Sequence, residues 1–251
     1  MRILGVIPAR YKSSRLEGKP LKDILGKPMV QHVFERARMS HDLTDVLVAT
    51  DDERIRKSVQ GFGGKVVMTS AHHKSGTDRV AEAVANLDVD VVVNIQGDEP
   101  LVDPILIDEC ISPFNSNAQV QIATVIQRLS DESTYSDPAV VKVVRDLSGR
   151  ALYFSRSLIP FPRVRERDFA VYEHIGIYAY TKECLLKLSQ LAPTKLETIE
   201  ELEQLRALEH GIPIQVVETQ RHFESVSVDT AADLERVRQI MAASQKERRV
   251  Q

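Results

Sequence analysis

The sequence predicts an α/β fold with a predominantly parallel, Rossmann-like sheet flanked by helices and a smaller antiparallel extension. One observation is that short apolar runs rich in β-branched residues alternate with helix-spaced segments early in the chain, as in parallel βαβ units. A second is that strand-like runs follow one another across polar turns from Val120 onward, as in antiparallel sheets. The 251 residues are enough for one large domain or for a core with an appendage.

Apolar spacing and helix-starting residues place the individual elements. The first of the expected parallel strands begins at Ile3, and the others cover residues 46–50, 65–68 and 89–95. Helices are expected after Pro28, over residues 53–60, after Ser75 and from near Pro104. Later strands are expected over residues 120–125, 140–144, 151–154 and 214–217, with one helix over 196–208 and a closing helix from Ala231.

A loop with several cationic side chains follows the first strand. Arg10, Lys12, Arg15 and Lys19 lie in it, together with the small donor Ser13. Open α/β sheets bind ligands at the carboxyl ends of their strands, and clustered cations repel one another unless negative oxygens lie among them. The loop therefore predicts a site for an anion such as a triphosphate. On charge alone, a solvated basic turn is an equally good interpretation.

The composition is that of an ordinary globular protein and limits the classes of partner. Hydrophobic residues make up 43% and charged residues 27%, with a formal net charge of −3, so the overall charge indicates neither nucleic-acid nor membrane binding. Cys110 and Cys184 lack the spacing of metal ligands, which favours reduced thiols. Because no leader-like or membrane-spanning run is evident, we expect a cytoplasmic protein without nucleic-acid or membrane partners.

The motifs of the first loop carry a family resemblance. The loop contains Ile7-Pro8-Ala9-Arg10, then Ser14-Arg15, then Gly18-Lys19-Pro20-Leu21. This pattern resembles the nucleotide-binding signature of the sugar-activating cytidylyltransferases, above all the CMP-KDO synthetase (3-deoxy-manno-octulosonate cytidylyltransferase) family. The resemblance implies that CTP is bound by Pro8, Ala9, Arg10, Ser13, Arg15 and Lys19. It also implies that Arg10 and Lys19 are catalytic.

Small polar residues begin two of the expected helices. Ser75-Gly76-Thr77-Asp78 is suited to a helix N-cap, the better interpretation from residue types alone, and also to the edge of a pyrimidine. In the resembled family the corresponding segment helps to recognise cytosine, which implies that Ser75 and Gly76 bind the nucleotide. We interpret Asp51 and Asp52 mainly as a helix cap, and secondarily as lining a ribose or base pocket.

Two acidic residues far apart in the sequence are candidate metal ligands. Asp98 follows the central strand within Gln96-Gly97-Asp98-Glu99-Pro100, where a carboxylate can hold Mg²⁺ against phosphate oxygens; a capped turn is the alternative. Asp229 precedes the closing helix and would by itself be interpreted as its cap. The resemblance implies that both residues bind Mg²⁺, that Asp98 is also catalytic, and that Gln96 contacts the sugar.

The antiparallel part carries the expected acceptor residues. Residues 151–156 (Ala-Leu-Tyr-Phe-Ser-Arg) and 174–178 (His-Ile-Gly-Ile-Tyr) look like the sugar-binding region of the same family. This implies that Arg156 pairs with the sugar carboxylate and that Tyr153 and His174 serve its hydroxyls. A surface arginine and a turn histidine are the alternatives. Residues 163–169 are expected to form a lid.

The helix expected over residues 196–208 places Glu200 and Gln204 on one face, where they are candidates for a sugar hydroxyl. Its apolar stripe is Ile199, Leu202, Leu205 and Leu208. Packing within the domain and a dimer contact explain this stripe equally well. The family resemblance implies a homodimer.

The implied organisation is a single cytidylyltransferase domain over residues 1–251. Residues 1–125 would mainly bind nucleotide, 126–210 would mainly bind the sugar and form the dimer, and 211–251 would return to the core. The implied reaction transfers CMP from CTP to the anomeric hydroxyl of 3-deoxy-D-manno-octulosonate (KDO), with Mg²⁺ as cofactor, releasing pyrophosphate and activating the sugar for lipopolysaccharide synthesis. The alternatives are the same reaction on 8-amino-KDO or a sialic acid, and a non-catalytic nucleotide-binding module.

Overall fold

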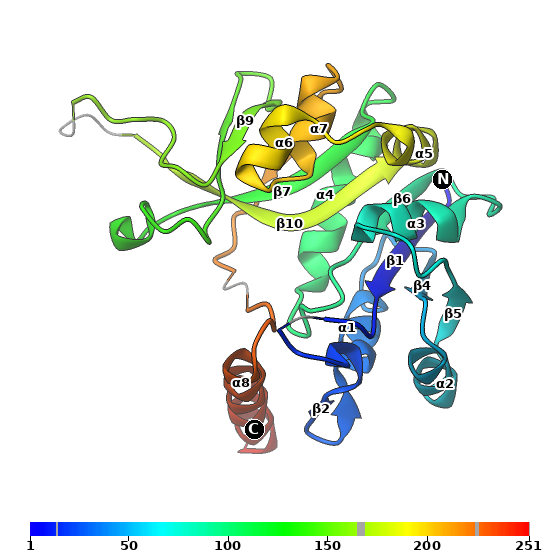
Figure 1. The fold of residues 1–251 in the computed structure, drawn as a ribbon. Coiled ribbons are helices and arrows are strands. Elements are labelled where there is room, and N and C mark those ends of the chain that lie inside the picture. The colour runs from blue at the N-terminus through cyan, green and yellow to red at the C-terminus, as the bar shows by residue number, and fades with distance from the viewer. Residues whose placement is uncertain (14, 165–168, 224–225, 251) are drawn as a thin grey trace. The chain divides into compact units, whose positions relative to one another are not determined.

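The computed structural model describes residues 1–13, 15–164, 169–223 and 226–250, with side chains described as far as residue 244. The chain divides into two compact units (Figure 1): unit 1 comprises Met1–Asp108 and Glu224–Gln251, and unit 2 comprises Glu109–Phe223. The helix α4 (Pro104–Ser116) begins in unit 1 and ends in unit 2. None of the helices in the described ranges is both long and apolar enough to cross a membrane.

The sheet of unit 1 is organised around β1 (Ile3–Ala9). β4 (Asp45–Thr50) and β6 (Val91–Asn94) pair with β1 in parallel, and β5 (Lys65–Met68) pairs in parallel with β4. All of β1 except Pro8 is buried, as expected for a parallel strand covered on both faces. The predicted parallel strands are confirmed.

The helices of unit 1 begin close to the expected residues. They are α1 (Met29–Ala37), α2 (Glu53–Gly61), α3 (Gly76–Val84) and α8 (Ala231–Val250). Between β1 and α1 lie a 3-10 turn, η1 (Lys19–Leu21), and the short antiparallel strands β2 (Asp23–Ile24) and β3 (Lys27–Pro28). Helices α1 and α3 pack on β1 and β4, whereas α2 packs on β4 and β5.

The register of these strands brings several loops to one edge of the sheet. Ala9 lies opposite Thr50, and the backbone N–H of Ile95 donates to the Val6 carbonyl at 3.0 Å. The chain therefore leaves β1, β4 and β6 on the same side. This is the edge at which parallel sheets bind their ligands.

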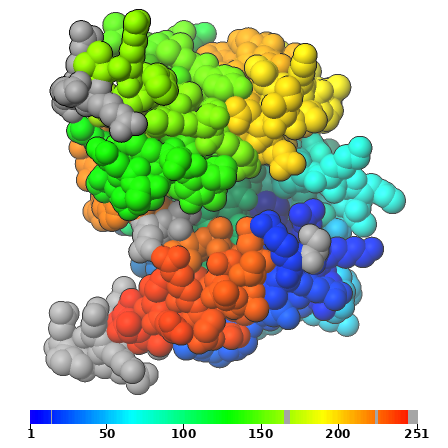
Figure 2. All heavy atoms as spheres, turned by 60° about the vertical axis from the view of Figure 1, so that its left-hand side comes forward, coloured from blue at the N-terminus to red at the C-terminus, as the bar shows by residue number. Residues whose placement is uncertain are grey.

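An apolar cluster fixes α8 against the beginning of the chain. The cluster consists of Ile24, Met29, Val226, Val228, Leu234 and Val237. Burying each such aliphatic side chain is worth about 1.5–3 kcal/mol. Figure 2 shows the contact from another side, with the orange atoms of α8 against the blue atoms of the N-terminal segment. The residues just before α8 are thereby held beside the first loop.

Unit 2 contains the predicted antiparallel extension. β10 (Tyr172–Thr181) pairs antiparallel with β7 (Ile122–Arg128) and β8 (Lys142–Arg145), and β9 (Ala151–Ser155) pairs antiparallel with β8. β11 (Ile214–Glu218) pairs in parallel with β7. The helical segments of this unit are η2 (Glu132–Thr134), α5 (Lys182–Gln190), α6 (Lys195–Glu200) and α7 (Gln204–Glu209). The predicted fold class is confirmed.

The limits of the two units do not coincide with those of the expected functional parts. Unit 2 begins at Glu109, whereas the expected nucleotide-binding part extends to residue 125. β11 lies in unit 2, beside β7, and the return to unit 1 comes only after Phe223. The division of functions among these parts stays a prediction.

Both cysteines are free and buried. Burial raises the pKa of the Cys184 thiol to about 11 and also raises the pKa of Cys110. Neither residue carries a thiolate at neutral pH, which agrees with the expected reduced, structural role.

The single helix expected over residues 196–208 is wrong. The segment forms α6 and α7, separated by a break that starts at Glu201. Glu201 is the C-cap of α6 and has φ +52°, a left-handed conformation that ends helices. As a result, Glu200 and Gln204 do not share one helical face.

Tertiary contacts explain the break. The Glu200 carboxylate accepts from the Ser155 hydroxyl at 2.7 Å and from the Arg156 backbone N–H at 3.0 Å. The break also buries Leu202, which is 6% exposed, while Ile199 is 67% exposed. The expected apolar stripe is therefore not formed, because these tertiary contacts override the favourable helix propensity of the segment.

Substituting Glu201 tests the cost of its left-handed conformation. We expect Glu201→Gly to raise the free energy of unfolding by about 0.5–1 kcal/mol, since relief of the left-handed strain exceeds the backbone entropy that glycine loses. Glu203→Gly is the matched control, because Glu203 has φ −58° and carries no such strain. Urea denaturation should show opposite signs for the two variants. Destabilisation by Glu201→Gly would contradict this interpretation.

Candidate active site

A pocket of about 350 Å³ lies at the carboxyl edge of the sheet in unit 1. Its lining residues are Pro8, Ala9, Arg10, Ser13, Arg15, Lys19, Pro20, His73, Lys74, Ser75, Gly76, Arg79, Gln96, Gly97, Asp98 and Asp229. All the residues that the sequence predicts for nucleotide, metal and catalysis are among them, as is Gln96. Structure thus brings together side chains from four separate segments of the chain.

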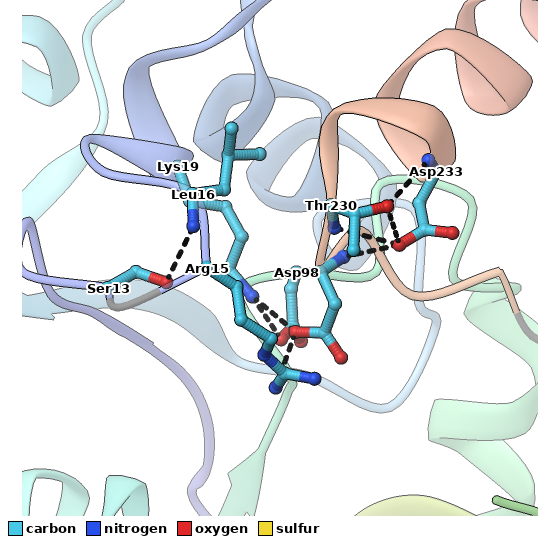
Figure 3. Close-up of polar contacts among 8 residues, drawn as sticks. Ser13, Arg15, Leu16, Lys19, Asp98, Thr230 and Asp233 are labelled. Atoms are coloured by element: carbon cyan, nitrogen blue, oxygen red, sulfur yellow. Dashed lines mark hydrogen bonds and ion pairs between the residues drawn. The ribbon is translucent and has the colours of Figure 1, made fainter.

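The centre of this pocket is an ion-pair cluster formed by Arg15, Lys19, Asp98 and Asp229. The Lys19 ammonium lies 2.8 Å from Asp98 and 3.2 Å from Asp229, and the Arg15 guanidinium lies 3.0 Å from Asp229. Figure 3 shows Arg15 and Lys19 pointing toward the acidic side chains. The Lys19 side chain is only 15% exposed, so its attraction to the carboxylates is screened less than at an open surface.

A closed turn of the first loop positions Lys19. Gly18 has φ +66°, a left-handed conformation that suits glycine, and its N–H donates to the Tyr11 carbonyl at 2.9 Å. Pro20 then occupies the start of η1, where its missing N–H is not needed. The Ser13 hydroxyl accepts from the Leu16 N–H at 3.4 Å (Figure 3). These contacts close the loop, so that Lys19 lies at the carboxyl edge of the sheet.

Gly97 brings the Asp98 segment close to β1. A Cβ atom on Gly97 would lie 2.5 Å from the Pro8 carbonyl oxygen, so any larger residue would force the two segments apart. On its other side, the Asp98 carbonyl accepts from the Val228 N–H at 2.9 Å. The Asp98 segment is thus fixed between β1 and the segment that precedes α8.

Asp229 does not cap α8, because its neighbours do. The Asp233 carboxylate accepts from the backbone N–H and the hydroxyl of Thr230, both at 2.8 Å, and the Thr230 hydroxyl accepts from the Asp233 N–H at 3.2 Å (Figure 3). This reciprocal arrangement satisfies the helix start. The Asp229 carboxylate is therefore left to face Arg15 and Lys19.

The helix-cap interpretation of Ser75 is confirmed. Its hydroxyl oxygen accepts from the Asp78 N–H at 3.1 Å at the start of α3. Because a hydroxyl also has a hydrogen to donate, capping leaves Ser75 one bond for a ligand. A Cβ atom on Gly76 would be in van der Waals contact with Pro8 at 3.4 Å, so Gly76 lies beside the end of β1. Recognition of cytosine here stays a prediction.

The two aspartates after β4 serve different helices. Asp52 caps α2 by accepting from the Arg54 N–H at 2.9 Å, as expected. Asp51 instead pairs at 2.9 Å with Arg79, which is 3% exposed. Neither aspartate lines the pocket, whereas Arg79 does, so the secondary interpretation as ribose or base ligands is not supported.

Sequence reasoning missed three cationic or ionisable residues of the pocket: His73, Lys74 and Arg79. All three flank the Ser75-Gly76 motif. The signal that could have found them is this adjacency, since the residues next to a ligand-binding turn share its location. Lys74 and Arg79 add positive charge to the lining of the pocket.

Three of the predicted acceptor residues of unit 2, Tyr153, Arg156 and Glu200, form a connected group. Besides Ser155 and the Arg156 N–H, the Glu200 carboxylate is hydrogen-bonded to the Tyr153 hydroxyl; burial, followed by the charge of Glu200, raises the pKa of that hydroxyl. The Arg156 guanidinium donates to the carbonyls of Glu200, Pro138 and Glu201 at 2.7, 2.8 and 3.3 Å. Arg156 thus holds the break between α6 and α7, a role that the sequence did not indicate.

His174 and Gln204 lie deeper in unit 2. The His174 ring is hydrogen-bonded to the Thr124 hydroxyl at 3.0 Å and packs edge-on against Phe154. Burial lowers the pKa of His174 to about 3, so the imidazole is neutral at physiological pH. The side-chain nitrogen of Gln204 is buried without a hydrogen-bond partner among the described residues. Of the lid expected over residues 163–169, residues 165–168 lie outside the described residues, and the lid stays a prediction.

The fold and this pocket together define a protein of the nucleotidyltransferase class. A cationic loop follows the first strand of a parallel sheet, and two carboxylates pair with its Lys19 in the pocket. This is the arrangement expected for a nucleoside triphosphate and its transfer chemistry. Residues 4–240 match the sequence model of the cytidylyltransferases, and the chain belongs to this family.

Individual relatives are similar over almost the whole chain. The 3-deoxy-manno-octulosonate cytidylyltransferase of Geobacter metallireducens is 49% identical over 247 residues, covering 94% of this chain and 96% of the relative. The 8-amino-3,8-dideoxy-manno-octulosonate cytidylyltransferase of Shewanella piezotolerans is 50% identical over 238 residues, covering 93% and 96%. Relatives that differ in the named sugar are thus equally similar to this chain.

Solved structures support the same family. A structure of CMP:2-keto-3-deoxy-manno-octonic acid synthetase complexed with CTP matches with a TM-score of 0.92 at 43% identity, covering 97% of this chain and 100% of that one. A cytidylyltransferase from Leptospira borgpetersenii matches with a TM-score of 0.62 at 18% identity, covering 95% and 85%. The second likeness supports the fold alone.

Adding a methyl group at Gly97 tests the close approach of the two loops. Gly97→Ala should lower the free energy of unfolding by about 1–3 kcal/mol, the usual cost of overpacking, and should weaken CTP binding because Asp98 is displaced. Gly61→Ala is the control, since a Cβ atom there meets nothing within 4 Å. Urea denaturation and CTP titration measure the two effects. Equal behaviour of the two variants would contradict the packing described.

Proposed function

We propose that the chain transfers CMP from CTP to the anomeric hydroxyl of KDO and releases pyrophosphate, activating the sugar for lipopolysaccharide synthesis. The observation that carries this proposal is the convergence of Asp98 and Asp229 on Lys19 in the pocket of a cytidylyltransferase fold. The names of relatives at 49% identity support KDO as the acceptor.

The acidic pair fits Mg²⁺. This ion favours one or two protein carboxylates together with phosphate oxygens and water. Within the described part of the chain, no group of three or more His, Cys, Asp or Glu side chains is placed to hold a metal, so the pair matches a site completed by substrate. Asp98 and Asp229, whose side chains are 29% and 30% exposed, would hold the ion. When bound, it neutralises charge on the phosphates and the attacking hydroxyl.

The cationic side chains bind and orient the triphosphate. Arg10, Arg15 and Lys19 line one side of the pocket and hold the α-phosphate for attack in line with the departing pyrophosphate. Negative charge develops on that leaving group, and Arg10 and Lys19 stabilise it. Pro8, Ala9, Ser13, Ser75 and Gly76 complete the nucleotide site.

Residues of unit 2 hold the acceptor. Arg156 pairs with the sugar carboxylate: its two terminal nitrogens each donate to one carbonyl and each keep a second hydrogen. The side-chain nitrogen of Gln204, buried without a partner among the described residues, donates to a sugar hydroxyl. Tyr153, His174 and Glu200 are the remaining contacts, with the neutral His174 serving as a hydrogen-bonding group rather than a charge.

We also propose that the protein is a cytoplasmic homodimer. In unit 2, Leu152, Leu196 and Ile199 are 60%, 37% and 67% exposed. An interface between copies would bury these side chains, and large apolar side chains of this kind mark interfaces where they gather in one patch. Ile199 belongs to the apolar stripe expected from the sequence, of which Leu202 and Leu205 are buried.

Specificity for the sugar is the main alternative within the same reaction. A relative named for 8-amino-3,8-dideoxy-manno-octulosonate is as similar as those named for KDO. The two sugars differ at one position, so a few pocket contacts decide between them. A sialic acid as acceptor and a non-catalytic nucleotide-binding module are the further alternatives from the sequence.

A pyrophosphate-release assay tests the proposal. Purified protein with Mg²⁺ should release pyrophosphate from CTP and KDO, and much less from ATP, GTP or UTP, or when 8-amino-KDO or a sialic acid replaces KDO. Asp98→Asn should lower kcat at least a hundredfold, because charge neutralisation at the transferred phosphate is lost. Asp88→Asn, at an exposed pair with Arg2, is the control. Turnover and CTP binding both unchanged in Asp98→Asn would favour the non-catalytic module.

A further inference from the structure

A contact that the proposed reaction does not use lies behind the cationic loop. The guanidinium carbon of Arg54 is 3.3 Å from the centroid of the Tyr11 ring. Arg54 is in the first turn of α2, and Tyr11 directly follows Arg10 in the loop. A guanidinium over the face of an aromatic ring is attracted by the negative charge of that face. The contact therefore links α2 to the nucleotide-binding loop.

The plane of the Arg54 guanidinium is fixed by Asp52. The side-chain nitrogens Nε and Nη2 donate to the two carboxylate oxygens of Asp52 at 2.9 and 2.7 Å. Two parallel bonds of this kind set the orientation of the fork as well as its position. Asp52 in turn is fixed by capping α2, and its hydrogen bonds with Arg54 lower its pKa. The stacked cation is thus anchored to the helix backbone.

The Tyr11 ring also contacts the turn that precedes Lys19. A Cβ atom on Gly18 would lie 3.0 Å from the ring, and the Gly18 N–H donates to the Tyr11 carbonyl. Tyr11 therefore stands where the first loop closes on itself. Helix α2 also packs against η1, the turn that begins with Lys19. A contact that fixes Tyr11 therefore also restrains the turn at Gly18, where the loop ends.

We propose that Arg54 is a positioning residue for nucleotide binding, which acts by stacking on Tyr11 and so holding Arg10 and Lys19 in place around the triphosphate. The proposal rests on the function proposed above. Arg54 is not among the residues that line the pocket, so its expected effect is indirect. Asp52, interpreted from the sequence mainly as a helix cap, gains a second role as the anchor of Arg54.

Arg56 offers a matched control on the same helix. It also carries an exposed guanidinium and pairs with an acidic residue, Glu53, three positions earlier. Among the described contacts, no aromatic ring lies beneath it. Removing Arg56 therefore takes away the same charge as removing Arg54 without disturbing the first loop.

The test compares CTP binding and steady-state kinetics of Arg54→Ala, Arg56→Ala and Tyr11→Leu. Arg54→Ala should raise the Kd and the KM for CTP about two- to fivefold, the range of an exposed cation–π contact, with kcat unchanged. Tyr11→Leu should give a similar rise without a change in charge, and the double variant should be no weaker than Tyr11→Leu alone. Tyr11→Phe keeps the aromatic face and should bind CTP as the unsubstituted protein does.

Two results would overturn the proposal. One is an equal effect of Arg54→Ala and Arg56→Ala, which would reduce Arg54 to a diffuse charge. The other is an effect of Arg54→Ala that persists undiminished in Tyr11→Leu. Asp52→Asn is a further variant that should still fold, since Asn caps helices as well as Asp. It removes the paired hydrogen bonds that orient the Arg54 guanidinium, so it should weaken CTP binding as Arg54→Ala does. Because CTP binding is measured without acceptor, this outcome is separate from that of the pyrophosphate-release assay.

Discussion

The active site depends on the balance of charge around one ammonium group. Two carboxylates held near each other repel, and a cation between them offsets the repulsion. Lys19 supplies that cation to Asp98 and Asp229, although 79 and 210 residues separate it from them in the sequence. Each segment reaches the cluster through its own backbone: the closed turn at Gly18, the approach of Gly97 to β1, and the start of α8.

The charge balance around Lys19 also depends on the apolar cluster between α8 and the beginning of the chain. Because Leu234 and Val237 pack on Ile24 and Met29, the C-terminal segment returns to the beginning of the chain. Thr230 and Asp233 then satisfy the helix start, which leaves the Asp229 carboxylate for the pocket. The position of Asp229 beside Lys19 therefore depends on the apolar packing of α8 as well as on its capping.

Features that follow from local sequence patterns could be predicted, whereas features that depend on tertiary contacts could not. Apolar runs located the parallel strands, and because such strands end at one edge, the loop of Arg10 and the segment of Asp98 could be placed together. The helix over residues 196–208 failed, since bonds from Glu200 to the end of β9 outweigh its periodicity. The pairs Arg79–Asp51 and Arg54–Tyr11 join residues with no spacing rule between them, so only the folded structure reveals them.

Binding of Mn²⁺, a spectroscopic substitute for Mg²⁺ that favours the same oxygen ligands, tests the central claim most directly. Measured by electron paramagnetic resonance in the presence of CTP, the affinity should fall about tenfold or more, equivalent to about 1.4 kcal/mol, in Asp98→Asn and in Asp229→Asn alike. If the two carboxylates bind one ion together, both variants should lose Mn²⁺ affinity. Full Mn²⁺ affinity in either variant would contradict a metal site made by the two acids together.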